Sequence, residues 1–254
     1  MTAGWGAEPG PLVDPHTVPS WLRDLVRATS VTDGRDIGRL TPPDDPGLRS
    51  AAVLMLFGAP SASGALPDVL LLRRADGGDV HSGQVAFPGG GAEPADGGPV
   101  DTALREAQEE TGVHPAGVRP VALLPEMYVP VSGFRVTPVL AHWERPSPVG
   151  VVDDGEVAAV ARVPVAELVD PANRFLVRIR KHYRGPAFGL PGMLVWGFTA
   201  GVLTWLLDAA GWAEPWDDRD VRDLDVALAA AARAAQPSAG CDSGGSATEP
   251  AEAT

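Results

Sequence analysis

Continuous apolar runs along the chain predict the strands of a sheet. Runs of this kind, bounded by glycine, proline or charged residues, are typical of buried strands. They lie at 51–57, 69–72 and, in a short form, 85–87. Residues 118–124, 135–142 and 157–163 are largely apolar and are predicted as further strands. Residues 175–183 instead alternate apolar and basic side chains, which predicts a strand with one face in water.

Apolar residues at helical spacing mark the remaining elements. Residues 20–27 carry an apolar stripe that follows Ser20, a good N-cap. Residues 99–112 have Pro99 in a position suited to the first turn and Gly112 in one suited to the end. The apolar face of this helix is Val100, Ala103, Leu104 and Ala107. Further helices are predicted at 166–169, 194–209 and 221–235. Because strands and helices intermix without a regular βαβ rhythm, we expect an α/β fold with a mixed sheet flanked by helices.

Length and composition indicate one principal domain with extended ends. A chain of 254 residues can bury a core of its own, and its 30 glycines and 26 prolines indicate long loops. We expect an N-terminal extension with a short helix over 1–48 and the principal domain over 49–212. A C-terminal helix over 213–235 and a disordered tail over 236–254 follow it.

The net charge of −13 restricts the partners of the chain. A protein this acidic is not expected to bind nucleic acid or anionic lipid through its overall field. It also repels a polyanionic substrate unless a cation lies between them. The only cysteine is Cys241, which excludes an internal disulfide and a cysteine-based metal site. With no basic start followed by an apolar stretch at the N-terminus, we expect a cytoplasmic protein without a secretory signal.

One uncharged segment raises the question of a membrane span. Residues 185–207 carry no charged side chain, but glycines and prolines interrupt them, and the part after Pro191 is short for a bilayer. We therefore expect a packed helix and no membrane contact. This helix, with Trp196 and Trp205, is expected in the core or at the surface of a homodimer. A groove for an acyl arm is the second interpretation.

Three glutamates share one face of the predicted helix 99–112. At about 100° per residue, Glu106, Glu109 and Glu110 fall in one sector beside the apolar stripe. Arg105 lies one turn before Glu109, where an ion pair can form. Like charges this close, in the C-terminal half of a helix, are unfavourable. A solvated face with counter-ions explains the cluster, and so does a divalent cation held by carboxylate oxygens.

A glycine run before this helix favours the cation. Gly89, Gly90 and Gly91 follow Pro88 in what we expect to be a turn. Glycines let the backbone approach a ligand closely. A glycine turn that leads into a carboxylate-bearing helix therefore suits a metal-bound phosphate.

Together these residues resemble the Nudix box, whose pattern is Gly-x5-Glu-x7-Arg-Glu-apolar-x-Glu-Glu-x-Gly-apolar. The matching residues are Gly90, Arg105, Glu106, Ala107, Glu109, Glu110, Gly112 and Val113. The first acidic position is Asp96, and eight residues rather than seven separate it from Arg105. The resemblance covers roughly residues 50–210 and implies the Nudix fold, an α/β/α sandwich around a mixed β-sheet.

The resemblance also implies an activity. It implies hydrolysis of a nucleoside diphosphate linked to another moiety, with Mg²⁺ or Mn²⁺ as cofactor. By position, Glu106 and Glu110 take the main metal-ligand places, and Glu109 is a further ligand or the group that activates water. Arg105 resembles the family arginine that orients the glutamates. A cation would reconcile a polyanionic substrate with an acidic protein and lower the pKa of a bound water. The base that takes the proton from this water is left open between Glu109 and a loop acid, Glu156, whose alternative is a surface role.

An upstream segment resembles the coenzyme A pyrophosphatase branch of this family. The signature of that branch is Leu-Leu-Thr-x-Arg, a spaced Arg, and Gly-x3-Phe-Pro-Gly-Gly. Here it runs through 70–74 and 83–90, with Leu72 in place of the Thr and Asp79 in place of the spaced Arg. The expected substrate is coenzyme A or a thioester of it, with a phosphopantetheine and 3′,5′-ADP as products. The alternatives are ADP-ribose, a dinucleotide or a nucleoside triphosphate, and a Nudix-like module that binds a nucleotide without cleaving it.

Several residues have both a binding and a structural interpretation. Gly89, Gly90, Arg74 and His81 are candidates for substrate binding, although His81 suits a hydrogen bond that holds its own loop. Either aromatic residue of the 127–134 segment, Tyr128 or Phe134, stacks on a base or packs in the core. The basic residues of 178–184 receive an extra phosphate or form a solvated strand face.

Overall fold

The computed structural model describes most of the chain. The described residues are 5–37, 41–45, 47–60, 62, 65–77, 81–179 and 183–234, with Tyr183 described by its backbone alone. The predicted tail, 236–254, lies outside them, as does Asp79. The predicted division of the chain into an extension, a principal domain and a C-terminal helix stays a prediction.

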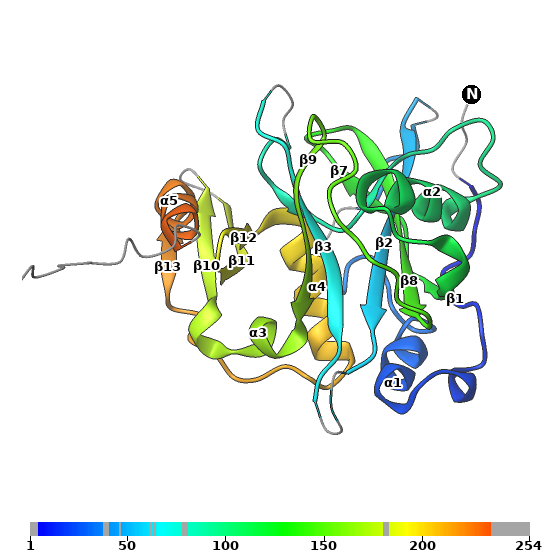
Figure 1. The fold of residues 1–254 in the computed structure, drawn as a ribbon, viewed down its shortest axis with the longest axis horizontal. Helices are drawn as coiled ribbons and strands as arrows, with labels where there is room; N and C mark the ends of the chain where they lie inside the picture. Colours follow the sequence, from blue (N-terminus) through cyan, green and yellow to red (C-terminus); the bar gives the residue numbers. More distant parts are fainter. Residues whose placement is uncertain are drawn as a thin grey trace, which may run out of the picture.

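A mixed sheet forms the centre of the molecule (Figure 1). Strand β2 (Arg49–Gly58) and strand β8 (Phe134–Trp143) run parallel through its middle. Strand β6 (Val118–Leu123) continues the sheet beyond β8, and β3 (Asp68–Arg74) and β9 (Val157–Pro164) continue it beyond β2. The short strands of this sheet are β1 (Gly10–Pro11), β4 (Val85–Ala86), β5 (Gly89–Gly91) and β7 (Met127–Val129).

Helices cover both faces of this sheet, as predicted. Ala52, Leu54 and Leu56 of β2 point toward α2 (Pro99–Thr111) and share one buried cluster with its apolar face. Met55 and Phe57, which alternate with them, pack on the opposite side in a cluster that includes α1 (Ser20–Ala28) and α4 (Gly197–Ala209). The period-two alternation of β2 therefore supplies two cores, and the α/β/α sandwich is confirmed.

A second, smaller sheet lies beside the first (Figure 1). Its strands, in order, are β12 (Met193–Val195), β11 (Tyr183–Leu190), β10 (Arg174–Ile179) and β13 (Val221–Asp223). Helix α5 (Leu224–Ala234) packs on it through Ala227 and the apolar side chains of β10 and β11. Between the last strand of the large sheet and the first strand of the small one, the chain forms the short helix α3 (Val165–Val169). The 3₁₀ turns among the described residues are Pro15–Thr17, Pro115–Gly117 and Pro171–Asn173.

Three predicted elements in this part of the chain were wrong in extent. The strand predicted at 175–183 comprises most of β10 and the first residue of β11, with 180–182 outside the described residues. The helix predicted at 194–209 begins at Gly197, because the Pro191–Gly192 turn folds β12 back onto β11. A Pro-Gly pair is typical of a tight turn, and Gly192 has a φ of 75°.

Pairing between strands explains the third error and one smaller one. The first residues of the helix predicted at 221–235 form β13, which pairs with β10 in parallel. The expected glycine turn at 89–91 is strand β5, paired with β2. Ser20 is the first residue of α1 rather than its N-cap, which is Pro19. Tertiary hydrogen bonding overrides local spacing in both strands.

No helix among the described residues is long and apolar enough to cross a membrane. The uncharged segment instead contributes Val202, Leu203 and Leu206 of α4 to the core between the helix and the large sheet.

Candidate active site

Helix α2 carries the three glutamates and ends as the sequence predicts. Pro99 is its first residue, and Gly112 closes it in the left-handed conformation at a φ of 70°. The three carboxylates do not share one environment. The side chain of Glu110 is 6% exposed, that of Glu106 is 17% exposed, and that of Glu109 is 58% exposed. Only two of the three glutamates are therefore withdrawn from solvent.

Glu110 is buried against the glycine strand. Its Oε2 accepts a hydrogen bond of 2.8 Å from the backbone N–H of Gly89, and its Oε1 lies 3.6 Å from Nη1 of Arg74. Burial raises the pKa of Glu110 to about 7, although the Gly89 hydrogen bond and Arg74 both oppose the shift. The negative charges of Glu106 and Glu156 raise this pKa further.

Glu106 lies over the next glycine of the same strand. A Cβ atom at Gly90 would be 2.5 Å from its carboxyl carbon, so the absence of a side chain there makes room for the carboxylate. Burial raises the pKa of Glu106, and the neighbouring charge of Arg105 counteracts part of this rise. The negative charges of Glu109 and Glu156 also raise the pKa of Glu106.

Gly89 is constrained by the backbone of the sheet. Its φ is 155°, and a Cβ atom there would be 2.6 Å from the Cα of Val53 and would overlap the carbonyl oxygen of Ala52. Strand β5 thus approaches β2 more closely than a residue with a side chain allows. This approach places the N–H of Gly89 within reach of Glu110.

Arg105 joins most of the acidic groups around the helix. Its Nη1 donates to Glu106 at 3.1 Å and to Glu109 at 2.9 Å. Its Nη2 donates to the carbonyl of Gly91 at 2.8 Å and to Asp96 at 3.1 Å. The guanidinium therefore ties the exposed end of the glutamate cluster to the glycine strand, which is a positioning role.

Asp96 is the acid that Arg105 neutralises most fully. Nε of Arg105 also donates to Asp96 at 3.1 Å, which completes a bidentate pair, and the hydroxyl of Thr102 donates to it at 2.7 Å. The hydrogen bonds from Arg105 lower the pKa of Asp96 to about 2, although burial opposes the shift. The loop acid thus anchors Arg105 and belongs to the framework of the site.

The side chains of Glu106 and Glu110 are chemically suitable ligands for a divalent cation. They offer buried carboxylate oxygens, the ligand type that Mg²⁺ prefers, and the charge of one raises the pKa of the other. Among the described residues, however, no three histidine, cysteine or acidic side chains converge as a metal-ligand group. The expected three-ligand cluster is therefore not assembled in this structure. Mg²⁺ commonly keeps several waters and uses one or two carboxylates, which fits this donor set.

Two further residues named from the sequence lie near this region. Glu156 contributes charge to both buried glutamates, and its carbonyl accepts a hydrogen bond of 2.8 Å from the N–H of Ala75, directly after β3. His81 lies in the turn before β4, where its Nδ1 is 3.2 Å from Oε1 of Gln84. Of the basic residues at 178–184, Arg178 pairs with Asp223 at 2.9 Å, and 180–182 lie outside the described residues.

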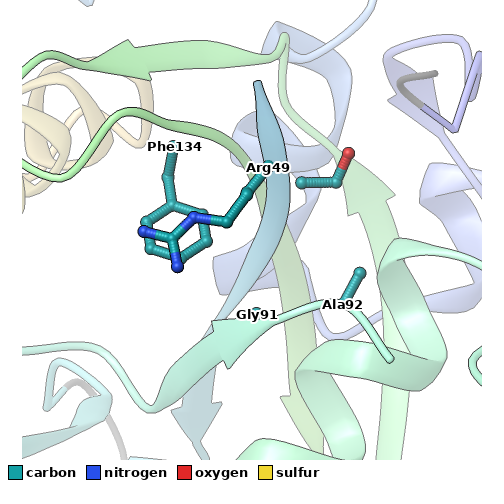
Figure 2. A pocket seen from close by; sticks show the side chains of 5 residues that line it. Arg49, Gly91, Ala92 and Phe134 are labelled. Carbon is teal, nitrogen blue, oxygen red and sulfur yellow. The ribbon is translucent and has the colours of Figure 1, made fainter. Parts of the chain in front are cut away.

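A cavity of about 260 Å³ lies beside Gly91, the last residue of the glycine strand (Figure 2). It is lined by Arg49, Ser50, Gly91, Ala92 and Phe134. The guanidinium carbon of Arg49 is 4.1 Å from the centre of the Phe134 ring. Sequence reasoning identified Phe134 but missed Arg49. The only signal for Arg49 in the sequence was that a cationic residue stands just before an apolar run.

A family model decides the family of the chain. The NUDIX domain matches residues 47–184, more than half of the sequence. This chain belongs to the Nudix family. The resemblance drawn from the glycine run and the helix is thereby confirmed, and so is the α/β architecture. The protein is accordingly a Nudix hydrolase, an enzyme that acts on a nucleoside diphosphate derivative.

Relatives of this Nudix hydrolase carry names from the same family. The chain is 37% identical over 158 residues to an uncharacterized Nudix hydrolase NudL from Cronobacter sakazakii, covering 61% of this chain and 79% of the relative. It is 34% identical over 160 residues to NudL of Escherichia coli K12, with the same coverage. Among solved structures, RenU, a Nudix hydrolase from M. smegmatis, is 20% identical with a TM-score of 0.43, covering 68% of this chain and 96% of RenU.

Proposed function

We propose that this Nudix hydrolase cleaves the diphosphate of coenzyme A or of its thioesters, releasing a phosphopantetheine and 3′,5′-ADP. The observation that carries the hydrolytic site is the pair of buried glutamates, Glu106 and Glu110, held against Gly89 and Gly90. The resemblance of residues 70–74 and 83–90 to the coenzyme A pyrophosphatase signature supports the substrate.

We assign the cation to Glu106 and Glu110, with Glu109 as a further ligand. A bound Mg²⁺ or Mn²⁺ supplies charge neutralisation at the phosphates and a water of lowered pKa. Arg105 holds Glu106 and Glu109 in position through the hydrogen bonds described above. Gly89 and Gly90 are the backbone candidates for substrate binding, because without side chains they let β5 lie against β2 and let the Glu106 carboxylate lie against the strand.

The remaining roles concern the substrate and the proton. Arg74, 3.6 Å from Glu110, is the first candidate to contact a substrate phosphate, and His81 in the turn before β4 is a second candidate. Glu109 and Glu156 are the two candidates for the base that accepts the proton of the attacking water. Glu109 is solvent-exposed, and the charge of Glu156 reaches both buried glutamates.

One observation favours a second candidate substrate. Asp79 replaces an arginine of the coenzyme A signature, and an acid there would repel a phosphate. In this alternative the same residues carry out the same hydrolysis, but the substrate is ADP-ribose, a dinucleotide or a nucleoside triphosphate.

A comparison of matched substrates tests the proposal. Purified protein would be incubated with coenzyme A, dephospho-coenzyme A, ADP-ribose, a dinucleotide and a nucleoside triphosphate, with Mg²⁺ or Mn²⁺, and the products identified by mass. We expect coenzyme A to give 3′,5′-ADP with the highest kcat/KM. A higher kcat/KM for ADP-ribose would overturn the substrate, and equal rates for coenzyme A and dephospho-coenzyme A would remove any role for the 3′-phosphate.

A further inference from the structure

We propose that the cavity beside Phe134 binds the nucleobase of the substrate, which stacks on the guanidinium of Arg49. This inference rests on the hydrolysis of a nucleoside diphosphate derivative and assigns the part of the molecule that recognises the base. It names Arg49 as a specificity-determining residue that the sequence pattern does not single out.

Arg49 and Phe134 form a flat stacked pair. The two residues are partners in the parallel register of β2 and β8, and the guanidinium carbon lies 4.1 Å from the ring centre. Figure 2 shows the guanidinium of Arg49 lying over the ring of Phe134 at the side of the cavity. Nη2 of Arg49 also donates to the carbonyl of Ser132 at 3.3 Å. The ring and this carbonyl together hold the guanidinium in one orientation.

A held guanidinium is a good surface for a planar base. Nucleobases stack on both aromatic rings and arginine, and the planar cation adds an electrostatic contribution. The opposite wall of the cavity is the backbone of Gly91 and Ala92, which leaves room for a ring. At about 30 Å³ for each water, a space of about 260 Å³ holds several water-sized groups.

The cavity lies at the right place relative to the acids. The carbonyl of Gly91 accepts the hydrogen bond from Arg105, and a Cβ atom on the same residue would be 3.8 Å from the ring of Phe134. Strand β5 therefore separates the glutamates from the stacked pair. Arg49 and Val53, the β2 residue opposite Gly89, are four residues apart, which is about 13 Å at about 3.3 Å per residue. With a base at Arg49, the sugar and the diphosphate would span this distance to reach Glu106 and Glu110.

Binding of two probes tests this assignment. ADP contains a base and a diphosphate, whereas inorganic pyrophosphate contains the diphosphate alone. Both would be titrated calorimetrically in the presence of Mg²⁺ into the wild type, Arg49→Ala and Phe134→Leu. We expect each substitution to weaken ADP binding about tenfold, which is near the low end of the affinity that one stacked base contributes. Pyrophosphate binding should change by less than twofold.

Matched variants separate stacking from other effects. Phe134→Tyr keeps the aromatic face and should retain ADP affinity, and Arg219→Ala removes an exposed arginine that pairs with Asp217 in a loop. Because Arg49 is exposed, we expect Arg49→Ala to fold, so this variant tests the inference even if Phe134→Leu does not fold. Unchanged ADP affinity in Arg49→Ala would overturn the inference, and so would an equal loss of ADP and pyrophosphate binding.

The outcomes also distinguish this inference from the proposed function. If wild-type protein hydrolyses a nucleoside diphosphate derivative while both variants bind ADP as the wild type does, only the base site is wrong. If the wild type binds neither probe and hydrolyses none of these compounds, the proposed function falls and the base site falls with it.

Discussion

The side chains of Asp96 and Glu110 are both almost covered by neighbouring atoms, but Glu110 lies deeper and the two acids have opposite pKa shifts. The side chain of Asp96 is 5% exposed and that of Glu110 is 6% exposed. Arg105 forms a bidentate pair with Asp96 and lowers its pKa to about 2, whereas Glu110 has Arg74 at 3.6 Å and a pKa of about 7. Burial is the main cause of the raised pKa of Glu110, and the hydrogen bonds from Arg105 are the main cause of the lowered pKa of Asp96.

This difference separates a framework from a site. Around Asp96 the charges are compensated, and the hydrogen bonds fix Arg105 against the glycine strand. Around Glu110 and Glu106 two acids are close together in a poorly solvated place, which favours a cation that supplies the missing charge. We expect substitutions in the first region to affect mainly stability and substitutions in the second to affect mainly activity.

The largest effect is expected from Glu106→Gln. The substitution keeps the size of the side chain and removes a proposed cation ligand, so kcat should fall about 10²- to 10³-fold, as when one group that stabilises transition-state charge is lost. Steady-state kinetics with the best substrate measures this effect. Glu167→Gln on α3, exposed and on another helix, should leave kcat unchanged. A full rate in Glu106→Gln would exclude Glu106 from the mechanism.

Arg105→Ala should have the largest effect on stability. It would leave Asp96 buried without its cation, which costs about 3 kcal/mol when a buried ion pair is broken from one side. Urea unfolding followed by tryptophan fluorescence measures the loss. Arg105→Lys should recover only part of it, because lysine cannot form the bidentate pair. A loss below about 1 kcal/mol would contradict the framework role.

Opposite pH dependences are expected from the two buried acids. Asp96 has a folded pKa below its ordinary value of 3.8, so its stabilisation is present above pH 3.8 and disappears as the pH falls toward 2. Glu110 has a folded pKa above its ordinary value of 4.5, so its contribution is fully present below pH 4.5 and is lost as the pH rises through 7.

Asp96→Asn and Glu110→Gln measure these two contributions in metal-free protein. Relative to the wild type, Asp96→Asn should lose about 2 kcal/mol at pH 6 and less at pH 3. Glu110→Gln should gain stability relative to the wild type as the pH rises from 5 to 8. Unfolding free energies across this range provide the readout. Parallel pH profiles for the two variants would refute the comparison.

Gly90→Ala should have the smallest effect on stability. The new Cβ would meet the end of the Glu106 side chain, which can move, so we expect a loss of less than about 1 kcal/mol but a fall in kcat of about tenfold. Gly150→Ala, where a Cβ would have no atom within 4 Å, serves as the control for kcat and melting temperature. Wild-type kcat in Gly90→Ala would show that the position of the Glu106 carboxylate is unimportant.

The sequence predicted the helix of the site better than the surroundings of its side chains. The ends of α2 follow from Pro99 and Gly112, and the ion pair of Arg105 with Glu109 follows from their spacing. Spacing along one helix could not reveal that Glu110 turns toward Gly89, because that contact depends on how β5 pairs with β2. For the same reason the cation–π pair of Arg49 and Phe134, which joins distant parts of the chain, had no local signal.

The same distinction holds for the fold. The buried strands and the two helical layers were predictable, because apolar runs and helical stripes are local patterns. Strands β5, β7, β12 and β13 were not predicted, because each is three residues long and exists only through its partner. Most of β11 was also missed, because Gly185, Pro186 and Gly189 interrupt the apolar pattern there. Short edge segments carry too few residues for a period to be read.

Titration of metal-free protein with Mn²⁺ tests the central claim most directly. Electron paramagnetic resonance counts free Mn²⁺, and the titration at pH 7.5 would compare the wild type with Glu106→Gln, Glu110→Gln and Asp96→Asn. We predict that the wild type binds Mn²⁺, that both glutamate variants bind it at least tenfold more weakly, and that Asp96→Asn loses less affinity than either. Equal Mn²⁺ affinity in the wild type and the two glutamate variants would contradict the assignment of the cation to these buried acids.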